Sequence, residues 1–331
     1  MRIRTIVPLM LGVIMVATAC GSGASQTTTV PTTATATVDE VSSTTTAAST
    51  STTSSDPAFP VTVEVDSGPV TIDEMPTRIV SLSPTATETL FAVGAGDQVV
   101  AVDEYSYYPP EAPVTDLSGF TPNVEAILSY SPDLLVIAGS PDDLQAAIEA
   151  VGIPVMLMDS AATLDDAYAQ IEALGLASGH GEEASTLVAE MQDRIAAVVD
   201  SIPTGAASMT FYHELDPTFY TVTSQTFIGQ IYQLLGLVNI ADDGDPDGYG
   251  FPQLSEEFII NADPDVIFLA DAQCCGASRE TVAARPGWSA MGAVTSGRVF
   301  PVDADIASRW GPRTAEFVEA VGAVMIGDGG G

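Results

Sequence analysis

Residues 125–138 read EAILSYSPDLLVIA and residues 257–270 read EFIINADPDVIFLA, and this stretch, repeated after 132 residues, decides the fold. Each copy predicts a short helix with a glutamate in its first turn, Glu125 or Glu257, followed by Pro-Asp and a buried strand. The helix dipole alone favours an acid in a first turn. The equal placement of one such acid in each half indicates an internal repeat, and therefore two similar lobes.

Short apolar runs alternate with helical patterns after Phe59, which is typical of α/β lobes built on parallel sheets. The chain has 331 residues and 46% hydrophobic composition, enough for two cores of about 100–150 residues each. The runs expected to form strands are Arg78–Leu82, Val99–Val102, Leu134–Ala138, Val155–Met158, Met209–His213, Val266–Ala270 and Val299–Val302.

Between the expected lobes, Glu182 to Ser201 has the apolar spacing of one long helix. We therefore expect an N-terminal α/β lobe at residues 58–176, a bridging helix at 177–204 and a C-terminal α/β lobe at 205–331. A helical connection would make a stiff hinge. An ordinary amphipathic helix packed on one lobe is the alternative.

The N-terminus reads as a targeting segment. Arg2 and Arg4 precede an apolar run that is too short to span a bilayer, which needs about 20 residues. Small residues then lead to Cys20, the pattern of a lipoprotein signal peptide (1–19) whose cleavage leaves an acylated cysteine. A secreted protein cut nearby is the alternative. Residues 20–57 are nearly all Thr, Ser and Ala and predict a disordered tether.

The charge balance excludes one class of partner. All nine basic residues are Arg, against 44 acids, and the formal net charge is −35. Binding to nucleic acid or to an anionic membrane surface is therefore not expected.

Catalytic motifs are absent from the sequence. The chain has two histidines, His180 and His213, so it cannot assemble a three-histidine metal site, and it has no Walker loop, His-Glu-x-x-His or Gly-x-Ser-x-Gly motif. We expect no enzymatic activity, no metal and no cofactor. His213, at the end of a strand, is expected to be a polar wall residue of a ligand site.

Aromatic residues gather just after strands, where α/β folds hold ligands. Tyr105 and Tyr108 follow the Val99–Val102 strand, and Tyr220, Phe251 and Trp310 lie in the second half. Aromatic faces give a large contact area at low entropy cost, which suits a broad and partly flat ligand.

Cys274 and Cys275 are adjacent, in a chain expected to be exported to a compartment that permits disulfides. We expect them to pair with each other at the edge of the ligand site and to stiffen a loop. A pair of free thiols that binds a soft metal is the alternative.

Three motifs resemble a known family. They are RIVSLSPTATE at 78–88, YSYYPP at 105–110, and PNVE at 122–125 followed by PDLLV at 132–136. Together they resemble the periplasmic cobalamin- and siderophore-binding proteins of ABC importers, a class with a helical backbone, and the similarity extends from about Arg78 to the C-terminal helix. The resemblance implies two Rossmann-like lobes joined by one long α-helix.

The resemblance also assigns roles to residues. It implies that Glu125 and Glu257 dock onto arginines of a dimeric permease, and that Asp305 and Arg309 form a polar pair at the ligand. Tyr108 and Phe251 fall near the aromatic walls. Two departures concern the ligand: the tryptophan expected near Gly119 is absent, with Phe120 beside this position, and the Cys274-Cys275 loop is foreign to the cobalamin binders.

We therefore expect a monomeric substrate-binding protein, anchored by lipid to the outer face of the membrane, that delivers a cobalamin-type corrinoid to an ABC permease and its ATPase subunits. Ferric siderophore or haem is the alternative cargo, and a tethered sensor without transport or a tethered hydrolase is the alternative of another class. The residues expected at the ligand are Pro84, Thr85, Tyr105, Tyr108, Gly119, Phe120, His213, Tyr220, Phe251, Cys274, Cys275, Asp305, Arg309 and Trp310.

Overall fold

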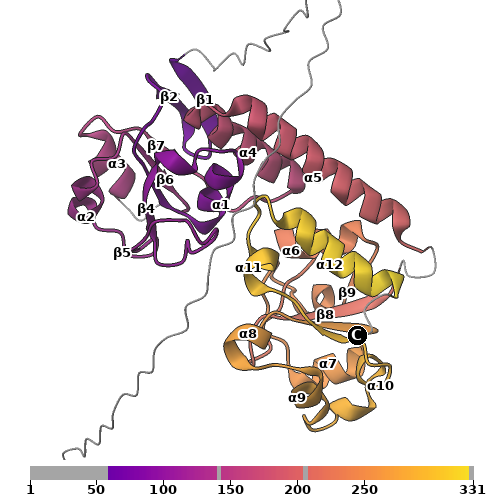
Figure 1. Cartoon of the computed structure of the whole chain (residues 1–331). Helices are drawn as coiled ribbons and strands as arrows, with labels where there is room; N and C mark the ends of the chain where they lie inside the picture. Colours follow the sequence, from indigo (N-terminus) through magenta and orange to yellow (C-terminus); the bar gives the residue numbers. More distant parts are fainter. Residues whose placement is uncertain (1–58, 140–142, 204–207, 328–331) are drawn as a thin grey trace, which may run out of the picture. The chain divides into compact units, whose positions relative to one another are not determined.

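A five-stranded parallel sheet forms the framework of the first lobe, with strand order β5-β4-β3-β6-β7 (Figure 1). The computed structural model describes residues 59–139, 143–203 and 208–327, so the expected signal peptide, Cys20 and the tether lie outside the described residues. The strands are β3 (Ile79–Leu82), β4 (Val99–Asp103), β5 (Val114–Leu117), β6 (Leu134–Ile137) and β7 (Val155–Leu157).

The second lobe is built on a four-stranded parallel sheet with strand order β11-β10-β8-β9. Both sheets carry the strands expected from the apolar runs, and the α/β class with parallel sheets is confirmed. The strands are β8 (Thr210–Glu214), β9 (Val238–Asn239), β10 (Val266–Leu269) and β11 (Val299–Pro301).

Helices cover both faces of each sheet. In β3 and β6 every residue is buried, and successive residues belong to different cores: Ile79 packs in the cluster that includes α1, α4 and α5, whereas Val80 packs with α2 and α3. The helices are α1 (Pro84–Ala92), α2 (Val124–Ser129), α3 (Leu144–Glu149), α4 (Leu164–Ser178), α5 (Gly181–Ser201), α6 (Phe227–Leu234), α7 (Glu256–Ala262), α8 (Ala272–Cys275), α9 (Arg279–Ala283), α10 (Gly292–Thr295), α11 (Ala304–Ser308) and α12 (Thr314–Ile326).

The sequence repeat is also a structural repeat. Asp133 accepts hydrogen bonds from the backbone amides of Thr77 and Arg78, which lead into β3. Asp265 accepts them from the amide and hydroxyl of Thr210 at the start of β8. Each Pro-Asp dipeptide therefore fixes the start of the neighbouring strand, which explains why the same residues recur in both halves.

The helix α5 packs against α4 on one side and α12 on the other (Figure 1). Both contacts are close because each neighbour presents a glycine: a Cβ added at Gly175 would lie 2.2 Å from Ala184, and one at Gly322 would lie 2.3 Å from Val198. Of the expected bridging segment, residues 181–201 form α5, and Gly179, with φ of 85°, ends α4 just before it.

Three features were not expected from the sequence. β1 (Val61–Val65) and β2 (Gly68–Ile72) form an antiparallel hairpin ahead of the first lobe, and β5 and β9 add edge strands to the two sheets. The edge strands escaped notice because β9 has two residues and β5 buries only Leu117 fully.

Along the described ranges, the structure contains no helix with the length and apolar character needed to span a bilayer.

Candidate functional site

A buried carboxylate, Glu88, lies between two arginines. Glu88 is on α1, which begins at Pro84 after the Ser83 cap, and its side chain is 1% exposed. Its Oε1 accepts hydrogen bonds from Arg309 Nη1 at 2.6 Å and Arg313 Nη2 at 2.5 Å, and its Oε2 accepts one from Arg313 Nε at 2.8 Å. Charge-assisted bonds of this length are strong and fix both guanidinium groups.

Asp305 completes the network. Its Oδ1 lies 3.0 Å from Arg309 Nη2, and its Oδ2 accepts a hydrogen bond from the Tyr107 hydroxyl, which raises the pKa of that hydroxyl. We call Glu88, Asp305, Arg309 and Arg313 the Glu88 cluster. It contains two carboxylates and two guanidinium groups, so its formal charges cancel.

The Glu88 cluster joins segments far apart in the chain. Arg309 Nη2 also donates to the backbone carbonyl of Tyr105 at 3.2 Å, and the Arg313 guanidinium lies 4.1 Å from the centre of the Tyr108 ring. The loop after β4 is therefore held against the segment between α11 and α12. Sequence reasoning placed Asp305, Arg309 and Tyr108 in the site but missed Glu88, although an acid on an otherwise apolar and Thr-rich helix face is a signal, since buried acids need partners.

Exposed aromatic side chains occur in both lobes at positions that the sequence analysis singled out. Tyr105 and Phe120 make an edge-to-face contact with ring centres 5.6 Å apart, and Phe120 is 78% exposed. In the second lobe Tyr220 and Phe251 lie on two neighbouring segments joined by the backbone hydrogen bond from Thr221 to Pro252, and both rings are exposed. Exposed apolar side chains that lie together, as Tyr105 and Phe120 do, mark binding surfaces.

A cavity of about 890 Å³ opens beside the Glu88 cluster. Its volume lies within the usual range for small-molecule sites, about 300–1,000 Å³. Its walls come from α1, the loop after β4, α5 and the start of α12, and they include Glu88, Phe91, Tyr108, Leu187 and Arg313. Charged and aromatic groups thus converge on one hollow.

The position of His213 corrects the sequence expectation that it is a wall residue. The side chain is fully buried, its Nδ1 lies 2.8 Å from the Tyr232 hydroxyl, and burial lowers its pKa to about 3. A ligand cannot touch it in this arrangement. The error has a physical reason: Phe211 to Glu214 in β8 are all buried because both faces of the sheet are covered, so the strand has no polar face.

Other expected residues make internal contacts. Trp310 donates from Nε1 to Gln170 Oε1 on α4 at 2.9 Å, and Thr85 and half-buried Pro84 begin α1. At Gly119 a Cβ would lie 2.7 Å from a carboxylate oxygen of Asp103. Position 119 itself therefore has no room for a side chain.

A second buried ionic group lies at the ends of β8 and β10, where Glu214 is 0% exposed. Arg285 donates two hydrogen bonds of 2.6 Å to its two carboxylate oxygens. Asp271 is also 0% exposed, and neither of its carboxylate oxygens has a hydrogen-bond partner among the residues that the structure describes. Burial, followed by the nearby Glu214, raises the pKa of Asp271 to about 6. We call Glu214, Asp271 and Arg285 the Glu214 cluster.

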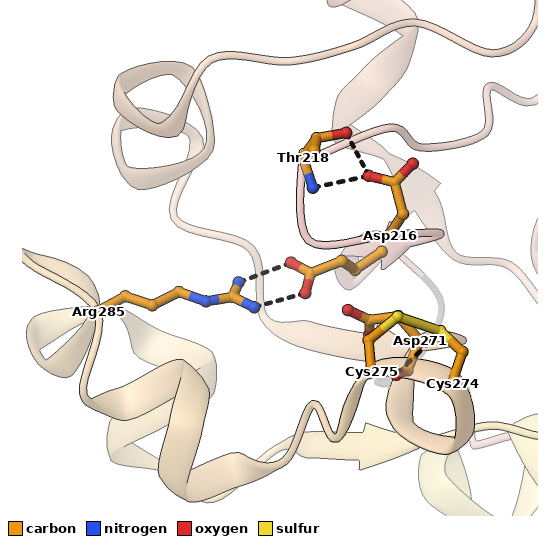
Figure 2. Close-up of a disulfide and its surroundings, with 7 residues drawn as sticks. Asp216, Thr218, Asp271, Cys274, Cys275 and Arg285 are labelled. Atoms are coloured by element: carbon orange, nitrogen blue, oxygen red, sulfur yellow. Dashed lines mark hydrogen bonds and ion pairs between the residues drawn. A yellow bond between two sulfur atoms is a disulfide. The ribbon is translucent and has the colours of Figure 1, made fainter. Parts of the chain in front are cut away.

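The structure joins Cys274 and Cys275 in a disulfide between adjacent residues, directly beside Asp271 (Figure 2). Both cysteines are exposed and form the end of α8. The disulfide is therefore at the surface, whereas the carboxyl group next to it is buried.

Glu125 and Glu257 are both exposed, and each lies in the first turn of a capped helix, α2 or α7. The side chains of Asn123 and Ser255 cap these helices in the same way. Each accepts a hydrogen bond from the backbone amide three residues later. The described residues contain no group of three or more His, Cys, Asp or Glu side chains arranged to hold a metal ion.

Comparison with known proteins places this chain in a family. Residues 79–306 match the periplasmic binding protein family model. An uncharacterised ABC transporter substrate-binding lipoprotein, YvrC of Bacillus subtilis, is 32% identical over 82% of this chain and 87% of its own. The vitamin B12-binding protein of Vibrio cholerae is 32% identical over 74% of this chain and 87% of its own. The periplasmic haem-binding protein RhuT of Roseiflexus has a TM-score of 0.65 at 25% identity, covering 76% of this chain and 98% of its own.

Proposed function

Because the chain belongs to the periplasmic binding protein family, as an ABC-transporter substrate-binding protein of the vitamin B12, siderophore or haem type, we propose that its cargo is a cobalamin-type corrinoid. Proteins of this class bind a small ligand, work with a permease and its ATPase, and are not enzymes. The neutral Glu88 cluster beside exposed aromatic rings is the observation that supports the corrinoid.

The charge balance at the site favours a cargo without strong negative charge. Arg309 and Arg313 are both bound to Glu88, and Arg309 also pairs with Asp305. A ferric chelate or a haem with ionised propionates needs cationic partners, and taking an arginine from Glu88 would leave a buried carboxylate unpaired, at a cost of several kcal/mol. The amide groups around a corrin ring need hydrogen bonds and an apolar surface, which this site offers.

The histidines also argue against haem, whose iron is usually held by His, Cys, Met or Tyr. His213 is fully buried, and His180, the residue before α5, has its Nε2 3.3 Å from Gln98 Nε2. His213 is closed to a ligand and His180 Nε2 is occupied by Gln98, which favours a cargo that needs no imidazole, although a tyrosine such as Tyr249 is 81% exposed. A cobalamin carries its own axial base and needs no such residue.

Calorimetric titration of the protein with cobalamin, cobinamide, haemin and a ferric siderophore tests the cargo. We expect the corrinoids to bind at least about 100-fold more tightly than the iron ligands, a difference of about 2.8 kcal/mol. Phe120→Ala should weaken corrinoid binding by about 1–3 kcal/mol through loss of an aromatic contact. Val151→Ala, at another exposed apolar position in the same lobe, is the matched control and should change nothing. Tighter binding of haemin would overturn the proposal.

We further propose that Glu125 and Glu257 dock onto arginines of the permease, with acylated Cys20 holding a monomer at the outer face of the membrane. The equal placement of two exposed acids in two repeated helices supports this role. Replacing both with Ala should leave corrinoid affinity unchanged but abolish stimulation of the transporter ATPase in proteoliposomes, because carboxylate–guanidinium pairs would set the register. Glu149→Ala, an exposed acid on α3, serves as the control. Persistence of full stimulation in the double variant would contradict the assignment.

A further inference from the structure

The disulfide between Cys274 and Cys275 does not hold distant parts of the chain together. It joins neighbouring residues, so it closes no loop whose entropy could stabilise either lobe. Both cysteines are exposed at the end of α8, a helix of four residues. A cross-link that is accessible to solvent and contributes little to the core is open to chemistry without unfolding of the lobe.

The helix α8 adjoins the unpaired carboxyl group of the Glu214 cluster. The amide of Cys275 donates to the Asp271 carbonyl at 3.0 Å, so α8 begins directly after the residue that carries this carboxyl group. Figure 2 shows Asp271 beside the disulfide, with Arg285 on the other side of the cluster. Arg285 donates its two side-chain hydrogen bonds to Glu214. Among the described residues, Asp271 therefore has no arginine hydrogen-bonded to its carboxyl group. A shift of α8 would therefore admit water to a buried acid.

A second contact connects α8 to the ligand side. Gln273 Nε2 donates to Asp303 Oδ2 at 3.2 Å, and Asp303 Oδ1 caps α11 by accepting from the amides of Asp305 and Ile306 at 2.9 and 3.1 Å. Asp305 in turn belongs to the Glu88 cluster. One side chain of α8 thus contacts the residue that positions a member of the candidate ligand site.

We propose that Cys274–Cys275 is a reversible thiol–disulfide site, with dithiols as its chemical partner, whose state sets the contact between α8 and the cap of α11. A dithiol thiolate attacks one cysteine sulfur and the Cys274–Cys275 bond breaks. The second thiol of the reagent then displaces the first cysteine. Two electrons and two protons pass to the cysteines, and the reagent leaves as a cyclic disulfide.

Reduction loosens α8 for a physical reason. A four-residue helix has too few hydrogen bonds to be stable by itself, and the disulfide restricts the peptide between its last two residues. With two free thiols that restriction is gone, and hydration of Asp271 favours the opened arrangement. The Gln273–Asp303 contact is then made for a smaller fraction of the time.

The test uses the whole protein purified without reductant and then equilibrated with dithiothreitol. Thiol alkylation with mass detection should find two new thiols while the near-ultraviolet circular dichroism stays native. Hydrogen exchange of the Asp305 and Ile306 amides should become about tenfold faster in the reduced protein. Failure of the thiols to form in the folded protein, or equal exchange in both states, overturns the proposal.

Two variants serve as matched controls. The double variant Cys274→Ser, Cys275→Ser should exchange at the reduced rate with or without dithiothreitol. Gln273→Met keeps the disulfide but lacks the bond to Asp303, so it should exchange fast already when oxidised and show no further change on reduction. Continued response of Gln273→Met to dithiothreitol would show that the coupling does not pass through this residue.

None of these measurements needs a cargo, so they test the thiol–disulfide site independently of the proposed function. A final titration of oxidised and reduced protein with cobalamin should give a several-fold difference in affinity, an expectation that rests on the proposed function. Absence of cobalamin binding in both states would refute the cargo and leave the thiol–disulfide site standing. Equal cobalamin affinity in both states would overturn its link to the ligand.

Discussion

The Glu88 and Glu214 clusters are both buried and both bind arginine in a bidentate manner, but their charge balance differs. In the Glu88 cluster, Arg309 and Arg313 face Glu88 and Asp305, so two positive groups meet two negative ones. In the Glu214 cluster one guanidinium faces two carboxyl groups, and Asp271 keeps a proton up to about pH 6. In the Glu88 cluster the charges of the side chains cancel one another. In the Glu214 cluster they cancel only while Asp271 is protonated, which depends on the pH.

This difference teaches that the role of a buried ionic cluster depends mainly on whether it contains an unpaired charged group. The Glu88 cluster leaves none, so it can offer hydrogen bonds and cation–aromatic contacts without needing a counter-ion from the ligand. The Glu214 cluster leaves one unpaired acid, Asp271, beside the short helix α8. Substitutions that change the charge balance of each cluster are therefore the most direct way to separate the roles of the two clusters.

Removing the carboxylate from the Glu88 cluster should have the largest effect. Glu88→Ala leaves Arg309 and Arg313 buried with only Asp305, so urea unfolding should show a loss of about 3–5 kcal/mol in the free energy of unfolding. Glu214→Ala is the counterpart in the other cluster. There Asp271 can ionise and become the partner of Arg285, so the loss should be at least about 1 kcal/mol smaller. Equal losses would contradict the difference in charge balance.

Asp271→Asn should stabilise the protein, but only above a certain pH. The pKa of Asp271 is raised from 3.8 to about 6 in the folded state, so between these values the folded chain holds a proton that the unfolded chain has lost. The contribution of Asp271 to the free energy of unfolding therefore falls as the pH rises through this window, and the asparagine variant lacks this fall. Its advantage should be about 1–3 kcal/mol at pH 7.5 and near zero below pH 4.

Urea unfolding at pH 4 and pH 7.5 measures the Asp271→Asn effect. Asp305→Asn is the control from the Glu88 cluster and should give no gain at pH 7.5, because its carboxylate is paired with Arg309. A gain for Asp271→Asn that is the same at both pH values would mean that the proton on Asp271 is not its cause.

Much of the fold could be predicted from the sequence because apolar periodicity reports burial directly. The repeat at residues 125–138 and 257–270 identified two strands, two helices and two matching acids. The pairing of Glu88 with Arg309 could not be predicted in the same way, because it joins residues 221 positions apart and no local pattern specifies the partner. The burial of His213 escaped prediction for the reason given above: a strand covered on both faces carries no periodic signal.

The smallest effect is expected at the surface pair Arg194–Glu319, whose side chains are 43% and 42% exposed. Glu319→Ala should cost less than about 1 kcal/mol, because solvent screens exposed ion pairs. The pair has the same bidentate geometry, through Nε and Nη2, as Arg313 and Glu88, so burial is what it lacks. A loss in urea unfolding as large as that of Glu88→Ala would show that geometry rather than burial sets these energies.

The glycines at positions 175 and 322 bear on the speed of capture. At these two positions Ala184 and Val198 of α5 pack directly against the glycines of α4 and α12, so bending at this helix would have to open two close contacts. With the proposed function, we therefore expect capture of the cargo to proceed without a slow domain rearrangement. The rate at which cargo is collected is then governed by how often a correctly oriented molecule arrives, which rises in direct proportion to its concentration outside the cell.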